Sequence, residues 1–316
     1  ANQLLVKVRG CAADKVRGRR PQGLDWLLGG FQGIPYPVHL ETTGDLANED
    51  VFVIPRIEPS PSLETHVEVR NNSAEAIEAV LTAAEQGGGF SHAPCPFRLR
   101  GGEAKTLVLK DAWDKPRLWW PHDPHLYNLD LAITAGGQTI DARRQRLGFR
   151  EVRVAGPDLF LNGVKALQRR SSTLAYWNVT TEERQKKEIA VLRDQGFNGY
   201  RMHLGASPRI ARISDELGWL VAPEGAICDP HGDGVLPEFW PAAEKHIRSM
   251  VKTMRNSPSV IYWCLSNEFA CYYMKGTPEE KDAVDAKMVA LGAAATALDP
   301  TRIWTCSGDG ELGGNG

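Results

Sequence analysis

The feature that most constrains the fold of this sequence is a change in the pattern of apolar residues near residue 155. Before that point, apolar and polar residues alternate in short runs, as in the segment His66–Arg70. A period of two residues is typical of a strand with one buried face. After that point, short apolar runs alternate with longer segments in which apolar residues recur every three or four positions, a pattern that predicts helices. We therefore expect an all-β part followed by an α/β part.

The all-β part contains short predicted strands separated by turn residues. Clusters such as Asn71-Asn72-Ser73 and Gly87-Gly88-Gly89 mark the turns. Residues 49–153 have about the length of an immunoglobulin-like β-sandwich, which is roughly 100 residues, whereas residues 1–48 are too few for a sandwich of their own. The predicted strands are Leu4–Val8, Val38–Leu40, Val51–Ile54, His66–Arg70, Thr106–Leu109, Leu126–Ile133 and Thr139–Ala142.

The α/β part contains four predicted helices. Thr180 and Glu183 have the spacing of a capping box, and the helix that they open is expected to run to Gln195, with Gly196 as its stop. The other helices are predicted to begin at Ser207, near Trp240 and at Thr277, and the first of these three is expected to end at Gly218.

Five apolar strands are predicted to alternate with these helices, and this alternation favours a parallel sheet. The sheet is either an open, doubly wound sheet or part of a (β/α) barrel, because a complete eight-stranded barrel needs about 250 residues. The predicted strands are Val164–Gln168, Gly199–His203, Leu220–Ala222, Val260–Leu265 and Ile303–Cys306.

Composition excludes several classes of function. The 37 Lys and Arg residues are balanced by 39 Asp and Glu residues, so the formal net charge is −2, and no basic surplus is present to bind nucleic acid. The longest apolar run, Val260–Leu265, is far shorter than the roughly 18 residues of a membrane helix. The 6 cysteines include no CxxC pair, so we expect free thiols and no zinc site. We predict neither a nucleic-acid partner nor a membrane partner.

Two further motifs point to ligands but lack the necessary context. Gly308, Gly310 and Gly313 spell GxGxxG, yet a dinucleotide site needs a helix directly after that motif. Asp229, His231 and Asp233 offer metal-binding atoms, but the prolines and glycines between them are typical of a turn-rich loop. We therefore predict no cofactor and no metal, and a nucleotide-dependent oxidoreductase stays only as a competing class.

The Asn267-Glu268 pair is the strongest catalytic candidate. It follows the predicted strand Val260–Leu265, and barrel enzymes place their chemistry at the carboxyl ends of strands. A carboxyl group in a segment rich in Trp and Tyr is suited to act as a general acid. The alternative is that Glu268 only caps the segment that follows it.

Several motifs occur in one order along the chain. They are Gln32-Gly33-Ile34 with Val38-His39-Leu40, Trp120-Pro121 with Pro124 and Leu126-Tyr127, Gly148-Phe149-Arg150, Phe160-Leu161-Asn162-Gly163, Gly196-Phe197-Asn198 with Arg201 and His203, Asp215-Glu216-Leu217-Gly218, and Asn256 through Asn267-Glu268. Together they resemble glycoside hydrolase family 2, which includes β-galactosidases, β-glucuronidases and β-mannosidases. Two positions depart from the family pattern, since Ser257 stands where His is usual and Cys264 stands where a small hydroxyl residue is usual. Arg201 and His203 are also one residue closer together than in the galactosidase branch.

The resemblance implies three regions. Residues 1–48 would be the end of a jelly-roll, sugar-binding β-sandwich, residues 49–153 an immunoglobulin-like β-sandwich, and residues 154–316 the first part of a catalytic (β/α)8 TIM barrel with about five strands. The chain would then be an internal piece of a longer enzyme. This reading leaves its cellular compartment unassigned and homo-oligomerisation open.

The resemblance also implies roles for individual residues in a retaining hydrolase of β-glycosides. Glu268 would be the general acid/base, and Asn267 would hydrogen-bond the 2-hydroxyl group of the sugar. Arg201 would orient the nucleophilic carboxylate, and His203 would either contact sugar hydroxyl groups or be a structural histidine. Glu224 would bind a hydroxyl group or a cation.

Trp263 is a further candidate, either as a platform for the sugar or as a packed core residue, and Trp304 shares these two readings. In the family the nucleophilic Glu lies on the seventh barrel strand, and the resemblance places no such residue in this chain. We therefore expect the chain by itself to be inactive. The competing class is a non-catalytic carbohydrate-binding or scaffolding relative of the family.

Overall fold

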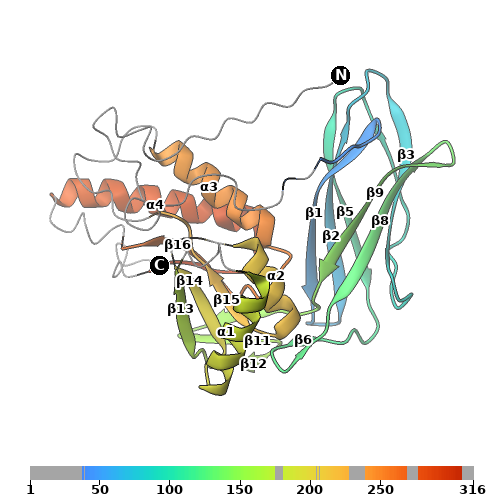
Figure 1. Cartoon of the computed structure of the whole chain (residues 1–316). Helices are drawn as coiled ribbons and strands as arrows, with labels where there is room; N and C mark the ends of the chain where they lie inside the picture. Colours follow the sequence, from blue (N-terminus) through green and yellow to red (C-terminus); the bar gives the residue numbers. More distant parts are fainter. Residues whose placement is uncertain are drawn as a thin grey trace.

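A computed structural model describes residue 38 and residues 40–174, 181–203, 205, 207–227, 239–268 and 277–307. The molecule consists of a β-sandwich and an α/β unit that lie side by side (Figure 1). The predicted strand Leu4–Val8, the motif Gln32-Gly33-Ile34, the loop with Asp229 and the glycines after Gly308 lie outside the described residues.

The sandwich is built from two antiparallel sheets. One sheet has the order β1-β2-β5 and the other has the order β4-β3-β8-β9. Alternating apolar residues of both sheets form one buried cluster, in which Val67 and Val69 of the first sheet join Leu129 and Leu131 of the second. The strands are β1 (Leu46–Arg56), β2 (Ser62–Asn71), β3 (Ile77–Glu85), β4 (Cys95–Leu99), β5 (Ala104–Ala112), β8 (Tyr127–Ala135) and β9 (Gln138–Leu147).

Two of these strands, β3 and β4, were not expected from the sequence. The segment of β3 is rich in Ala and Glu, which favour helices, but its backbone pairs with β8 from Val80 to Glu85. Burial of Leu81 and Ala83 in the sandwich core overrides the local helical preference. β1 begins at Leu46, so the expected boundary between residues 48 and 49 falls inside a strand.

A short antiparallel sheet connects the two units. Its strands are β10 (Val152–Ala155), β11 (Asp158–Leu161) and β12 (Val164–Lys165). Val164 was expected in the first parallel strand, and this expectation is wrong, since β12 pairs antiparallel with β11. A separate small sheet has two antiparallel strands, β6 (Trp119–Trp120) and β7 (Asp123–Pro124).

The α/β unit alternates five parallel strands with four helices. β13, β14 and β15 pair in parallel, as do β16 and β17, and the bridges Val221↔Val260 and Glu224↔Cys264 connect β15 to β16. The strands therefore neighbour one another in chain order, whereas the strand order of a doubly wound sheet reverses. The elements are β13 (Arg170–Leu174), α1 (Glu182–Asp194), β14 (Gly199–His203), α2 (Pro208–Leu217), β15 (Leu220–Pro223), α3 (Phe239–Met254), β16 (Trp263–Asn267), α4 (Pro278–Leu298) and β17 (Trp304–Ser307).

The ends of the helices follow from their capping residues. The Ser207 side chain accepts from the Ile210 N–H at the start of α2, and Thr277 and Glu280 form a capping box at the start of α4. The capping box expected at Thr180 and Glu183 is wrong by one residue. The N-cap of α1 is Thr181, whose side chain accepts from the Arg184 N–H.

Gly218 is needed both for its backbone conformation and for close packing. It ends α2 with a φ of 66°, which is in the left-handed region that favours glycine. A Cβ atom at this position would lie 2.1 Å from the carbonyl oxygen of Pro121. The close approach places the end of α2 against the connection between β5 and β8 of the sandwich.

The two units are joined by buried polar contacts. The Trp119 indole N–H donates to the carbonyl of Asp215 at 2.9 Å. The Asn256 amide donates to the carbonyl of Val51 at 2.7 Å and accepts from the Val53 N–H at 3.0 Å. The Asn256 amide thus pairs with the backbone of β1 as a neighbouring strand would. These two hydrogen bonds fix the position of the α/β unit along β1.

Candidate active site

Four of the predicted site residues converge at the carboxyl ends of the parallel strands. Arg201 and His203 lie two residues apart on β14, so their side chains point to the same face of the sheet. Glu224 directly follows β15, and Asn267 is the last residue of β16. The fold therefore brings together residues that lie up to 66 positions apart in sequence.

Glu224 is the centre of this group. Its side chain is 0% exposed, and its Oε2 atom accepts from Arg201 Nε at 2.7 Å and from the Cys264 thiol at 3.2 Å. Its Oε1 atom lies 3.0 Å from Nδ1 of His203. A buried carboxylate is tolerated when its charge is paired and its oxygens are hydrogen-bonded, and these contacts meet both conditions.

The contacts of Glu224 fix the orientation of its two basic neighbours. Since a carboxylate only accepts, Nδ1 of His203 carries the proton, and Nε2 is the atom available to a ligand. Arg201 also donates from Nη2 to Oδ1 of Asn267. An arginine cannot accept, so the amide oxygen of Asn267 faces Arg201 and its NH₂ group is left to donate to a ligand.

Cys264 supplies a neutral donor to the same carboxylate. Burial raises the pKa of the Cys264 thiol, and the negative charge of Glu224 raises it further. The residue therefore stays a thiol near neutral pH and donates S–H to Glu224. A hydroxyl group at this position, as the family pattern has, would make the same contact.

Glu268 differs from Asn267 in both exposure and backbone. Asn267 is 6% exposed, whereas Glu268 is exposed and has a φ of 51°. A non-glycine residue in the left-handed region is uncommon, and such residues cluster at functional sites. The chain thus turns sharply at the end of β16 and directs Glu268 away from the buried strand.

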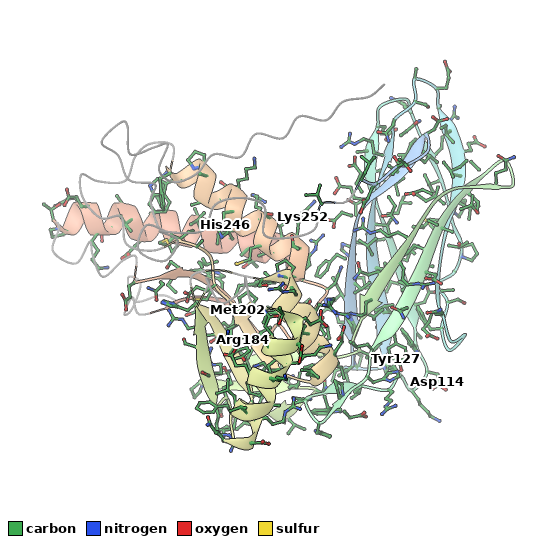
Figure 2. All side chains as sticks on the ribbon, in the orientation of Figure 1. Asp114, Tyr127, Arg184, Met202, His246 and Lys252 are labelled. Carbon is green, nitrogen blue, oxygen red and sulfur yellow. The ribbon has the colours of Figure 1, made fainter. Side chains whose placement is uncertain are left out.

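His246 supports the segment after Glu224, and no sequence motif indicated it. His246 projects from α3 and is labelled in Figure 2. Its Nε2 atom accepts from the Ala226 N–H at 2.9 Å, and burial lowers its pKa, which favours the neutral ring that can accept. The same segment is tied to β16, because the Asn267 N–H donates to the carbonyl of Ile227 at 2.8 Å.

Trp263 does not belong to this group. It is 0% exposed, lies in the core cluster with residues of α3 and α4, and donates its indole N–H to Asp299 at 3.0 Å. Trp304 packs against the same cluster. These placements fit the packing reading and leave the Trp263 ring without a face for a sugar.

Within the described ranges, no group of three or more His, Cys, Asp or Glu residues has the geometry of a metal site. The candidate loop with Asp229, His231 and Asp233 falls outside those ranges. Of the helices that the structure describes, none is both long enough and apolar enough to cross a membrane.

An ion-paired carboxylate, an arginine, a histidine and an amide thus meet at the carboxyl ends of parallel strands, the edge at which (β/α) barrels carry their functional sites. The family model of glycosyl hydrolases family 2 matches residues 47–150, and the model of the TIM barrel domain of that family matches residues 151–313. The chain belongs to glycosyl hydrolases family 2.

Individual relatives support this assignment. A putative beta-glucuronidase of Formosa agariphila is 27% identical over 240 residues, which are 73% of this chain and 28% of that protein. A beta-galacturonidase from Eisenbergiella tayi, solved bound to galacturonate, has a TM-score of 0.71 at 21% identity and covers 83% of this chain and 46% of its own. The exo-chitosanase CsxA of Amycolatopsis orientalis has a TM-score of 0.69 at 21% identity, with 84% of this chain and 32% of its own covered. The chain therefore spans less than half the length of these relatives.

Proposed function

We propose that this chain carries the acid/base half of the active site of a retaining hydrolase that cleaves β-glycosides. Family membership supports the reaction class, and the cluster of Arg201, His203, Glu224 and Asn267 supports the place of the site. The observation that carries the proposal is the strand end at Asn267-Glu268, where a fixed amide is followed by an exposed carboxyl group on a left-handed backbone.

The proposed division of the chain follows the resemblance. The sandwich from residue 46 onward would be immunoglobulin-like, and the five parallel strands in chain order would be the first five of an eight-stranded barrel. Residues 1–45 would belong to the preceding sugar-binding sandwich. The nucleophilic carboxyl group would come from a later strand of the complete protein.

Each residue then has a proposed role. Glu268 protonates the leaving oxygen in the first step and takes a proton from water in the second step. The NH₂ group of Asn267 donates to the 2-hydroxyl group of the sugar, a contact that strengthens in the transition state. Nε2 of His203 faces a further hydroxyl group, and Arg201 orients the nucleophile.

The contacts change the role proposed for Glu224. Both of its oxygens are occupied by Arg201, His203 and Cys264, so we assign it to positioning these side chains rather than to binding a hydroxyl group or a cation. The relatives named above act on glucuronides, galacturonides and chitosan. We therefore propose that the substrate is a β-linked sugar of a polysaccharide or conjugate, with uronides as the first to assay.

The test is the variant Glu268→Ala in the complete enzyme. With poor leaving groups the rate should fall by about 10²–10⁴-fold, because protonation of the leaving oxygen is lost. Dinitrophenyl glycosides need little protonation, so they should still form the covalent intermediate and then stall. Azide needs no general base and should release that intermediate as the β-glycosyl azide, which NMR identifies.

The matched control is Glu244→Ala, which removes an exposed carboxyl group on α3 and should leave all rates unchanged. A loss in Glu268→Ala that is independent of the leaving group, with no effect of azide, would refute the acid/base assignment. An α-glycosyl azide would make Glu268 the nucleophile. Saturable sugar binding by the wild type without hydrolysis of any glycoside would instead indicate the non-catalytic relative.

A further inference from the structure

A cavity lies at the junction of the two units, away from the strand ends that carry the proposed active site. Its volume is about 220 Å³. Its walls come from the end of β1, from the connection at residues 147–153, and from the loops at residues 255–258 and 300–302. An occupant of this cavity would therefore touch both the sandwich and the α/β unit.

The walls of this cavity carry far more positive than negative charge. Glu151 contributes the only carboxyl group among the described lining residues, and its Oε2 atom already accepts from the Ile57 N–H at 3.0 Å. The lining arginines are Arg56, Arg150, Arg153, Arg255 and Arg302.

Two of these arginines have carboxylate partners. Arg302 is paired with Asp299 at 2.6 Å, and Arg255 is paired with Asp50 at 2.5 Å. The Nε atom of Arg255 is buried and has no acceptor among the described residues. Arg255 therefore has one N–H donor without an acceptor among the described residues, although the residue is ion-paired.

Arg150 is the unusual residue of the cavity. It is only 5% exposed, and within the described part of the chain no carboxylate oxygen lies within 4 Å of its guanidinium. It donates to carbonyl oxygens alone, namely those of Pro258 at 2.9 Å, Val260 at 2.8 Å and Ser257 at 3.4 Å. Its Nη1 group has no acceptor among the same residues.

The environment of Arg150 is unfavourable to its charge. Burial lowers the pKa of Arg150 well below its ordinary value, and the nearby positive charge of Arg302 lowers it further. The negative charges of Asp299, Asp215 and Glu151 act in the opposite direction but offset these effects only in part. Both guanidinium groups donate to the same carbonyl, that of Val260. Carbonyl dipoles compensate a buried cation only partly, and a buried charge normally has a counter-charge.

A neighbouring cavity of about 470 Å³ shows the contrast. It is also lined by basic residues of both units, but there Arg146 is paired with Asp215 at 3.0 Å and Lys252 with Asp50 at 3.2 Å. Figure 2 shows Lys252 on the part of α3 that faces the sandwich. Arg143 also lines that second cavity and donates only to carbonyl oxygens, but it is exposed. Of the basic residues that line these two cavities, Arg150 is the one that is both buried and without a carboxylate partner among the described residues.

We propose that the cavity around Arg150 binds a small tetrahedral oxyanion, phosphate or sulfate, which links the sandwich to the α/β unit. A guanidinium group binds such oxygens through parallel N–H donors. The space is ample, because a single water needs only about 10–15 Å³. Bound there, the anion supplies the counter-charge that Arg150 lacks and joins loops of both units.

The test is titration of the full chain with inorganic phosphate at constant ionic strength, followed by calorimetry and by ³¹P NMR. We expect saturable binding of one phosphate per chain with a Kd of about 1 mM or tighter, competition by sulfate, and a Tm that rises with phosphate concentration. A parallel titration with glucose 6-phosphate distinguishes a free ion from the phosphate group of a metabolite, because the proposal predicts that the free ion binds more tightly.

Arg150→Gln removes buried hydrogen bonds that hold the fold together, so the decisive variants replace the lining arginines nearer the surface. Arg56→Gln combined with Arg153→Gln should weaken phosphate binding by about tenfold or more. The control is Arg98→Gln, which removes an arginine of β4 that lies outside the cavity and is 68% exposed, and it should keep the wild-type Kd. General salting effects of phosphate would act on all these proteins alike.

Absence of saturable phosphate or sulfate binding would overturn the proposal. So would an unchanged Kd in the double variant. Tighter binding of glucose 6-phosphate than of phosphate would place the physiological ligand among phosphorylated metabolites and refute the free-ion form of the proposal.

Discussion

Replacing Glu224 by Gln tests whether this carboxylate organises the candidate site. The change keeps the shape of the side chain and removes its charge. Arg201 then loses its ion-pair partner, which lies 2.7 Å away. If the new amide NH₂ group faces Arg201, two donors meet and that hydrogen bond is lost. If it faces His203, the ring must take its other tautomer so that Nδ1 can accept, and Nε2 then becomes a donor.

The expected magnitude follows from burial. Removing one partner of a buried ion pair costs about 3–5 kcal/mol. The Arg201 side chain is 25% exposed while that of Glu224 is fully buried, so we expect the lower end, about 3 kcal/mol in the free energy of unfolding. For a unit of this size each kcal/mol lowers Tm by about 2–4 °C, which gives a decrease of about 6–12 °C.

Calorimetry and urea unfolding measure the effect, with Glu244→Gln as the matched control. Glu244 is paired with Arg248 at 2.8 Å, nearly the same distance, but the two side chains are 47% and 45% exposed. Exposed pairs of this kind contribute about 0.3–0.5 kcal/mol. If both variants lose the same stability, the ion pair at Glu224 does not organise the site. In the double variant Glu224→Gln with Arg201→Gln, the loss should be smaller than the sum of the single losses.

Further predictions concern the surroundings of the site and the chain itself. Burial lowers the pKa of His246, so the unfolded chain takes up the proton first as pH falls below about 6.5; urea unfolding should show stability that declines through this range, and His246→Ala should abolish part of that decline. Gly218→Ala should cost well over 1 kcal/mol, since its Cβ would meet the Pro121 carbonyl, whereas Gly156→Ala, with a φ of 57° and open space, should cost only about 1 kcal/mol. Cys264→Ser keeps a donor to Glu224 and should change stability by less than about 1 kcal/mol, while Cys264→Val removes the donor and should cost about 1–3 kcal/mol. The purified 316-residue chain should not hydrolyse aryl β-glycosides, and saturable turnover by a defined monomer would show that the nucleophile lies within it.

Structural features that depend only on residues close in the sequence were predicted correctly. The caps of α2 and α4 and the glycine stop at Gly218 follow from local hydrogen bonds and from the conformational freedom of glycine. The predicted strands within β2 and β14 follow from their apolar patterns. Local physics acts on a short window of residues, so a short window is enough to predict it.

Features that depend on distant partners were missed or misplaced. β3 is rich in residues that favour helices, but it forms a strand because it pairs with β8 and buries its apolar side chains in the core of the sandwich. Val164 was expected in a parallel strand and pairs instead with Leu161 in a small antiparallel sheet. In both cases the pairing partner decides the structure, and the residues themselves do not specify that partner.

The candidate site divides in the same way. The sequence by itself determined which residues stand at the ends of β14, β15 and β16, because strand ends and motif order are read along the chain. Only the tertiary structure decided that Glu224 accepts from Arg201 and His203, and that His246 supports Ala226. It also decided that Arg150 is buried and donates to the backbone carbonyls of residues 257–260. The reason is physical: burial and ion pairing are properties of groups that folding brings together from distant parts of the chain, and the cost of each charge depends on all of its neighbours at once.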